Sequence, residues 1–307
     1  MTTREEQLAL LILSVVDECL REIKFPKEYL PKTKLHKIIY DVSEELDLEI
    51  TRSWYLRGKF VWCARDPISR FFDITSNLSY AESEFRVFGL TKGVVKRAVD
   101  MALRKFNVLT TRLNNYLAEL YKHEAPEDYK GLYITHIYLK EKLEELLEEM
   151  SDCLNKHALS VNSFSNIIVR YHLELSRLDD IAGPVVEYTT LMDELLIGAE
   201  EKFNKNKLSE EHIEFLKTIF CYYDDTVWKL PATYVAEKTM KGPRKHDLIS
   251  KLRNQRRELI EKIENKMYEL EEKAYEIDMF PSEKYLAERV SWDDEVSREY
   301  FKLMTNI

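Results

Sequence analysis

Basic and aromatic side chains crowd into residues 51–65, TRSWYLRGKFVWCAR, which hold four cations, four rings and no acid. Guanidinium and ammonium groups pair with phosphates, whereas aromatic rings stack on bases or anchor protein interfaces. The function of the segment depends on which way its rings point. We expect most of the rings to pack against neighbouring helices. Arg52, Arg57 and Lys59 then project from a β-hairpin as a basic wing.

Two basic runs occur in a chain whose formal net charge is −9. Residues 51–105 contain eleven Lys and Arg against five Asp and Glu, and residues 238–257 contain eight against one. A segregated basic patch binds phosphates by releasing counterions even when the whole chain is acidic. The alternative is that each run is the solvated face of a helix. The predicted nucleic-acid-binding residues are Arg52, Arg57, Lys59, Arg65, Lys245, Arg253, Arg256 and Arg257.

Catalytic signatures are absent from the sequence, which contains no GxxxxGK[ST], GxGxxG, GxSxG or HExxH motif. Cys153 and His157 lie four residues apart on an expected helix, and His172 could join them as a third zinc ligand. Their spacing matches no zinc-ligand pattern, so we expect them to pack in the core. Adjacent acids such as Asp224 and Asp225 point about 100° apart on a helix, as in caps and turns. We predict no enzyme activity, no metal and no cofactor.

Helical periodicity dominates the chain, because glycine is scarce and alternating Val, Ile and Thr runs do not recur. The predicted fold is mainly α. Residues 1–89 form an N-terminal winged-helix-like module, with two helices and a short β-hairpin around Gly58. Residues 90–240 form a multi-helix bundle that begins with one long helix over 91–120. Residues 241–307 form a long coiled-coil-like helix and a C-terminal tail.

An apolar seam follows the helix expected from His246 to Asp278, with three- and four-residue spacing close to a heptad pattern. This seam must pack within the chain or across a two-fold axis, and the second arrangement gives a homodimer. Arg256 lies in the seam, where a cation is costly unless an acid meets it. The predicted partner-binding residues are Trp54, Tyr55, Ile263, Met267 and Leu270.

The apolar run Leu8–Val16 is about half as long as a membrane span requires. It has acidic flanks and no basic leader, so we expect a core helix and a cytoplasmic protein without membrane contact. The four cysteines are too widely spaced for a disulfide framework, which favours free thiols. Only two glutamines accompany abundant Glu and Lys, a composition typical of thermophile proteins.

The segments KLHKIIY (34–40) and SWYLRGKFV (53–61) resemble the Panacea-type antitoxin domain. In that family a Lys-Leu-x-Lys-Leu-x-Tyr-like helix precedes an aromatic residue and a Gly-Pro-hydrophobic turn. Tyr40 matches the aromatic helix position and Trp54 with Gly58 the turn, while Lys59 stands where the family usually has proline. The resemblance implies a helical module that recognises a protein partner, often a toxin, and it implies no enzyme.

These features together predict a non-enzymatic regulatory or adaptor protein that binds nucleic acid, either duplex DNA or another nucleic acid, through local basic segments. The alternative is an antitoxin-like or scaffold protein whose ligand is another protein, such as a toxin. The two functions differ in whether the basic segments or the aromatic and apolar side chains make the contact.

Overall fold

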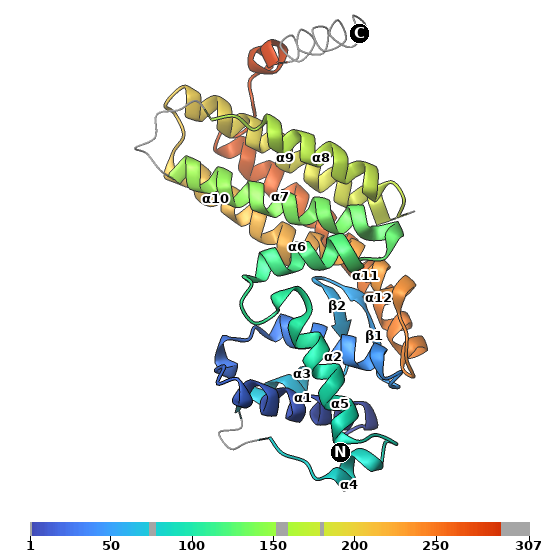
Figure 1. The fold of residues 1–307 in the computed structure, drawn as a ribbon. Coiled ribbons are helices and arrows are strands. Elements are labelled where there is room, and N and C mark those ends of the chain that lie inside the picture. Colours follow the sequence, from blue (N-terminus) through green and yellow to red (C-terminus); the bar gives the residue numbers. More distant parts are fainter. Residues whose placement is uncertain (1, 74–77, 152–158, 179–180, 290–307) are drawn as a thin grey trace, which may run out of the picture. The chain divides into compact units, whose positions relative to one another are not determined.

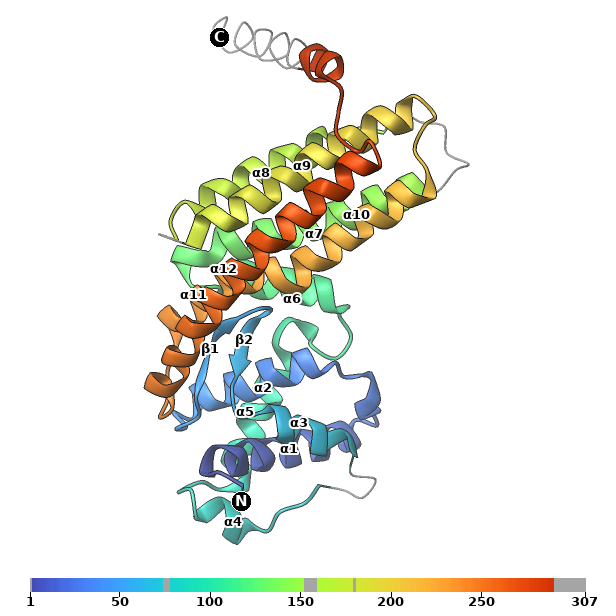
Figure 2. The same ribbon diagram turned by 180° about the vertical axis from the view of Figure 1, so that it is seen from behind.

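A computed structural model describes residues 2–73, 78–151, 159–178 and 181–289. The fold of these residues is mainly α, as predicted, and includes a single two-stranded antiparallel hairpin (Figures 1 and 2). The chain divides into two compact units. Unit 1 comprises Met1–Ile137 and Lys229–Glu258, and unit 2 comprises Tyr138–Trp228 and Leu259–Ile307.

Unit 1 combines the N-terminal helices with the hairpin and two later helical segments. Its elements are α1 (Arg4–Glu22), η1 (Lys27–Tyr29), α2 (Lys32–Glu45), β1 (Arg52–Tyr55), β2 (Gly58–Val61), α3 (Arg65–Asp73), α4 (Glu82–Arg86), α5 (Lys92–Arg104), η2 (Lys105–Asn107), α6 (Leu113–Glu124), the first part of α7 (Glu127–Ser151), α11 (Lys229–Thr239) and the first part of α12 (Lys245–Glu276).

Helix α1 forms the centre of unit 1, since its residues from Leu8 to Leu20 are nearly all buried against α3 and α5. A capping box starts the helix: the Thr3 hydroxyl accepts from the Glu6 amide at 3.2 Å, and the Glu6 carboxylate accepts from the Thr3 amide at 2.7 Å. The apolar run Leu8–Val16 is therefore a core helix, as predicted. No helix in the described part of the chain has the length and apolar character of a membrane span.

The prediction of a single helix over residues 91–120 is wrong. The chain leaves α5 at η2, where Phe106 and Asn107 have φ values of 50° and 51°, and α6 begins only at Leu113. The Lys34 ammonium group donates to the carbonyl oxygens of Val108 and Thr111, each at 2.6 Å. These bonds satisfy carbonyls that a continuous helix would have paired internally, so a distant lysine stabilises the break.

The hairpin predicted around Gly58 is confirmed. Strands β1 and β2 pair with Arg52 opposite Val61 and Tyr55 opposite Gly58, and Gly58 has a φ of 82° that suits the turn. The outer edge of β1 is also covered, because Arg52 and Lys241 exchange backbone hydrogen bonds of 3.0 and 2.9 Å. The hairpin is therefore an internal element of unit 1 and not a free wing.

Unit 2 is a bundle of long helices that run alongside one another in both views (Figures 1 and 2). Its elements are the second part of α7, α8 (Asn162–Leu175), α9 (Ala182–Asn204), α10 (Glu210–Tyr222), the π-helical turn η4 (Tyr223–Val227) and the second part of α12. Gly198 allows close packing, because a Cβ there would lie 1.9 Å from the carbonyl oxygen of Met279.

Helix α12, Lys245–Glu276, confirms the long helix expected over 246–278. Its seam is buried within this one chain: Ile263 is fully buried, Leu270 is 3% exposed, and Met267 is partly exposed. The apolar seam thus belongs to the core of unit 2 and is not available for a homodimer unless that core opens. The division into segments 1–89, 90–240 and 241–307 stays a prediction. Unit 1 contains residues from all three of these segments.

Candidate functional site

The two basic runs of the sequence meet in unit 1, although residues 106–237, more than 130 residues, separate them. Besides the Arg52–Lys241 bridge, the amide of Trp54 donates to the Thr239 hydroxyl at 2.9 Å, and the amide of Arg244 donates to the Thr51 hydroxyl at 3.1 Å. Strand β1 consequently lies against the loop before α12 and against α11. Figures 1 and 2 both show the hairpin beside the first turns of α12.

Burial corrects the expectation that Arg52 and Lys59 face solvent: they are only 7% and 5% exposed. The Arg52 guanidinium donates to the carbonyl oxygens of Leu48 and Ile50 at 3.1 and 3.2 Å. Alternation places Arg52 and Lys59 on the same face of the hairpin as Trp54, which packs inward. Of the three cations expected on a wing, Arg57 alone is exposed.

Lys59 is held in an ionic cluster with Asp41, Glu124 and Lys105. Its ammonium group pairs with Asp41 and, at 2.7 Å, with Glu124, and Lys105 pairs with the same two acids. Burial opposes the charge on Lys59, but the two carboxylates outweigh it and raise the lysine pKa. The cluster ties α2, β2, η2 and α6 together, so its role is structural.

The motif residues of α2 also point inward. Lys37 is 2% exposed and donates to the carbonyl oxygen of Lys59 at 2.7 Å, while burial, and then the charge of Arg57, lower its pKa well below the usual value. Tyr40 is 4% exposed, and the Lys59 ammonium lies 5.2 Å from the centre of its ring. The residues behind the Panacea resemblance therefore join α2 to the hairpin.

Glu237 neutralises part of the second basic run. Its carboxylate accepts two bonds from Arg253, at 2.6 and 2.9 Å, and also pairs with Arg256. Burial raises the pKa of Glu237, but the two guanidinium groups outweigh it and lower the pKa. Arg256, which lies in the seam and has a side chain only 13% exposed, therefore has Glu237 as its acidic partner.

Exposed cations remain in the hairpin turn, at the start of α3, in the loop before α12 and on the first half of α12. We define the basic surface as Arg57, Arg65, Lys241, Arg244, Lys245, Lys251, Arg253 and Arg257, all exposed. Within the described ranges, no acid lies in ion-pair distance of Arg57, Arg65, Lys245 or Arg257. Lys241, Arg244 and Lys251 pair with exposed acids, which contributes little and is easily exchanged.

Three aromatic rings pack on the other face of the hairpin. Tyr55, Phe60 and Trp62 have ring centres 5.2 to 5.4 Å apart. Tyr55 is buried under α12, where its hydroxyl hydrogen-bonds the side chain of Gln255. Phe60 and Trp62 stay partly exposed. Arg257 lies two residues after Gln255 on α12 and therefore projects from a different side of that helix, whereas Arg57 is exposed in the turn of the hairpin.

Charge is divided between the two units, a feature that counting along the sequence missed. Unit 1 contains 30 Lys and Arg against 23 Asp and Glu, and unit 2 contains 16 against 32. The signal is hidden in the sequence because unit 1 is assembled from two separate segments. The unit with the net positive charge, unit 1, is also the unit that carries the basic surface.

Metal-ligating groups do not gather in the described part of the chain, where no three His, Cys, Asp or Glu side chains could hold an ion together. Cys153 and His157 lie outside the described residues, and His172 bonds the Thr189 hydroxyl at 2.8 Å. Of the cysteines in those ranges, Cys19 and Cys63 are buried free thiols and Cys221 is an exposed one.

Comparison with protein-family models places much of the chain in a family. A family model described as a domain of unknown function (DUF8098) matches residues 100–305, more than half of the chain. No curated protein and no solved structure matches. The matched region includes residues 241–257 of the basic surface, whereas Arg57 and Arg65 precede it.

Proposed function

The chain belongs to this family of unknown function (DUF8098), and we propose that it is a non-enzymatic regulatory or adaptor protein that binds nucleic acid through the basic surface of unit 1. The observation that carries the proposal is the joining of β1 to the loop before α12. It brings two basic runs, far apart in sequence, to one edge of unit 1.

Electrostatics favour phosphate as the ligand. From Arg244 to Arg257 the surface follows α12 for about 20 Å, a length that accommodates several nucleotides. Four of its cations have no acid partner in the described residues, so a phosphate need not displace an ion pair to reach them. Counterion release then supplies most of the affinity.

We expect the basic surface to bind single-stranded nucleic acid more tightly than a duplex. Arg52 and Lys59 are buried, so only Arg57 of the three expected cations is left on the hairpin to contact a duplex backbone. Phe60 and Trp62 instead expose part of their rings, which pack edge-to-face on each other. Unstacked bases can pack on such rings, whereas the bases of a duplex cannot reach them.

Fluorescence anisotropy with labelled polythymidine and a duplex of equal length tests the proposal across a salt series. Arg57→Glu with Lys245→Glu should weaken binding and lower the salt slope by about 1 to 2. The matched control, Arg170→Glu with Lys207→Glu, reverses two exposed charges in unit 2 and should leave binding unchanged. Absence of binding at low salt, or equal losses in both variants, would reject the proposal.

A protein ligand is the second candidate, which the Panacea resemblance of residues 34–61 favours. Lys37 joins α2 to β2 in the helix-and-turn arrangement that the resemblance implies. Trp54 and Tyr55 are buried, so a partner that reads this module would contact Arg57 and the partly exposed Phe60. Copurification of a stoichiometric protein from the native host, lost on Arg57→Glu, would favour this function.

A further inference from the structure

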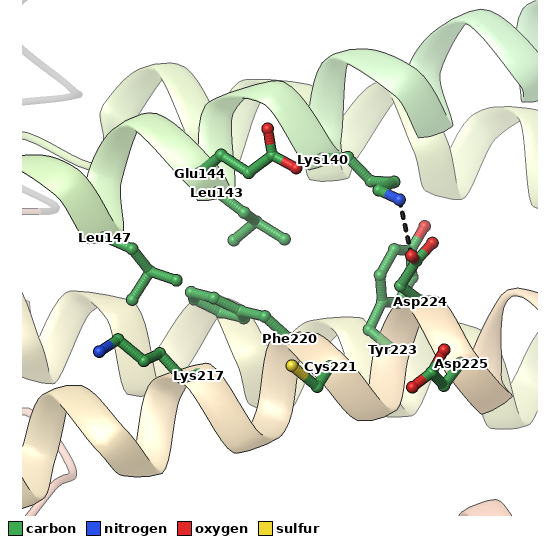
Figure 3. Close-up of a pocket in the computed structure, with 10 residues that line it drawn as sticks. All are labelled: Lys140, Leu143, Glu144, Leu147, Lys217, Phe220, Cys221, Tyr223, Asp224 and Asp225. Atoms are coloured by element: carbon green, nitrogen blue, oxygen red, sulfur yellow. Dashed lines mark hydrogen bonds and ion pairs between the residues drawn. The ribbon is translucent and has the colours of Figure 1, made fainter. Parts of the chain in front are cut away.

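A groove of about 300 Å³ lies in unit 2 between the second half of α7 and α10 (Figure 3). Leu143 and Leu147 of α7 and Phe220 of α10 form its floor. Glu144 lies on the α7 rim, and Asp225 of η4 lies at one end. None of these residues belongs to the basic surface, so the groove is independent of the nucleic-acid proposal.

The spacing of the lining residues gives the groove its direction. Positions 140, 143, 144 and 147 of α7 and positions 217, 220, 221 and 224 of the facing segment all line it. Each set spans two helical turns on one face, which corresponds to about 10 Å along the helix axis. The groove therefore runs parallel to the helices that form it.

The rim is acidic after its ion pairs are taken into account. Lys140 pairs with Asp224 at 2.6 Å, as Figure 3 shows, and Lys217 pairs with Glu214 at 2.6 Å. Glu144 and Asp225 are exposed, and neither has an ion-pair partner within the ranges that the structure describes.

Neighbouring side chains show the same excess of negative charge. Burial, together with repulsion from Glu144 and Glu145, raises the pKa of Glu141 one turn before the rim. Unit 2 as a whole has twice as many acids as Lys and Arg. A ligand of the groove must accordingly offer apolar side chains to the floor and cations to the rim.

We propose that this groove is a docking site for a basic amphipathic helix of a partner protein. A valley between two packed helices accepts a third helix, whose apolar residues at i, i+3, i+4 and i+7 enter it. A peptide that binds by adding a β-strand would need an exposed strand edge, which two helices do not provide. The short floor limits the contact to a few apolar side chains, so we expect affinity in the roughly micromolar range.

Cys221 supplies a reporter within the groove. It is exposed and lines the groove wall, whereas Cys19 and Cys63 are buried and burial raises the pKa of each thiol to about 12. The probe is a helical peptide of leucine, lysine and alanine, with leucines on one face and lysines on the other. A scrambled peptide of the same composition is its control.

Alkylation of Cys221 by iodoacetamide, followed by mass spectrometry of the fragment that contains it, measures occupancy in the full-length protein. The helical peptide should slow alkylation severalfold, and the scrambled peptide should not. Glu144→Lys with Asp225→Lys should raise the apparent Kd of the peptide about tenfold or more. Both positions are exposed, so these changes should leave the fold intact.

The matched control is Glu261→Lys with Glu272→Lys, which reverses two exposed charges elsewhere in unit 2. It should change the apparent Kd by less than about twofold, because neither position lines the groove. The proposal fails if both pairs weaken binding equally or if the scrambled peptide protects as well. It also fails if Cys221 becomes protected with rising protein concentration alone, since the occupant is then a second copy of this chain.

Discussion

The backbones of Gly242 and Thr51 are in contact. A Cβ on Gly242 would lie 2.6 Å from the Cα of Thr51, and the φ of Gly242 is 107°, a value that side chains disfavour. The contact lies beside the backbone bridge between Arg52 and Lys241. One glycine therefore allows the loop before α12 to approach β1, and it fixes how the two basic runs meet.

Gly242→Ala should destabilise unit 1 by about 3 kcal/mol, because the new Cβ meets backbone atoms and the φ value becomes strained. Urea denaturation followed by circular dichroism measures the loss. Gly93→Ala is the control: it lies in α5 with nothing within 4 Å of an added Cβ, and alanine favours a helix by up to about 1 kcal/mol. Equal midpoints for the two variants would show that the contact is unimportant.

Lys59→Ala should cost about 3 kcal/mol, because the partly buried carboxylates of Asp41 and Glu124 would lose one of their two cationic partners. Arg57→Ala, two residues earlier and exposed, should change stability by less than about 0.5 kcal/mol. Nucleic-acid binding should depend on Arg57 and not on Lys59. Among variants that stay folded, Arg57→Ala should therefore bind nucleic acid more weakly than Lys59→Arg, which keeps the charge in the cluster. A Lys59→Ala protein as stable as the wild type would contradict the structural role of Lys59 in the ionic cluster.

His36 should make unit 1 less stable in mild acid. Burial, and then the charge of Lys37, lower the His36 pKa to about 3, below its ordinary 6.5. The unfolded chain binds the proton first, so the free energy of unfolding falls as pH drops from 6.5, by about 1.4 kcal/mol per pH unit.

Denaturation at pH 6.5 and 5 tests this dependence on His36. His36→Phe keeps a ring stacked on Phe60, 4.4 Å away, but removes the titration, and should be about 2 kcal/mol less sensitive to this change of pH. His246→Phe, at an exposed position, should behave as the wild type does. An unchanged pH dependence in His36→Phe would contradict the assignment.

Periodicity and turn chemistry were sufficient to predict the mainly α fold, the hairpin at Gly58 and the long helix α12. These features are local: a glycine with positive φ marks the turn, and a seam of apolar residues marks the helix face. The break after α5 was not predictable in this way. It depends on Lys34, more than 70 residues earlier, which bonds the carbonyl oxygens of Val108 and Thr111.

The basic surface was predictable only as composition. A count of charges cannot distinguish Arg57, which is exposed, from Lys59, whose partners Asp41 and Glu124 come from other helices. The groove gave no sequence signal either, because Leu143 and Phe220 occur at the same spacing as any core residue. Tertiary pairing decides which cations remain available, and sequence spacing does not contain it.

Ile263→Asp with Leu270→Asp should unfold unit 2 and should not separate a dimer. Both side chains are buried within one chain, so each aspartate would place an unpaired carboxylate in the core, and the double variant should lose more than about 4 kcal/mol. Circular dichroism should show lost helix, and light scattering should show aggregation in place of a halved mass. Glu264→Ala with Glu271→Ala, two exposed positions on the same helix, should keep the wild-type signal. A folded double variant with half the wild-type mass would instead place the seam between two chains.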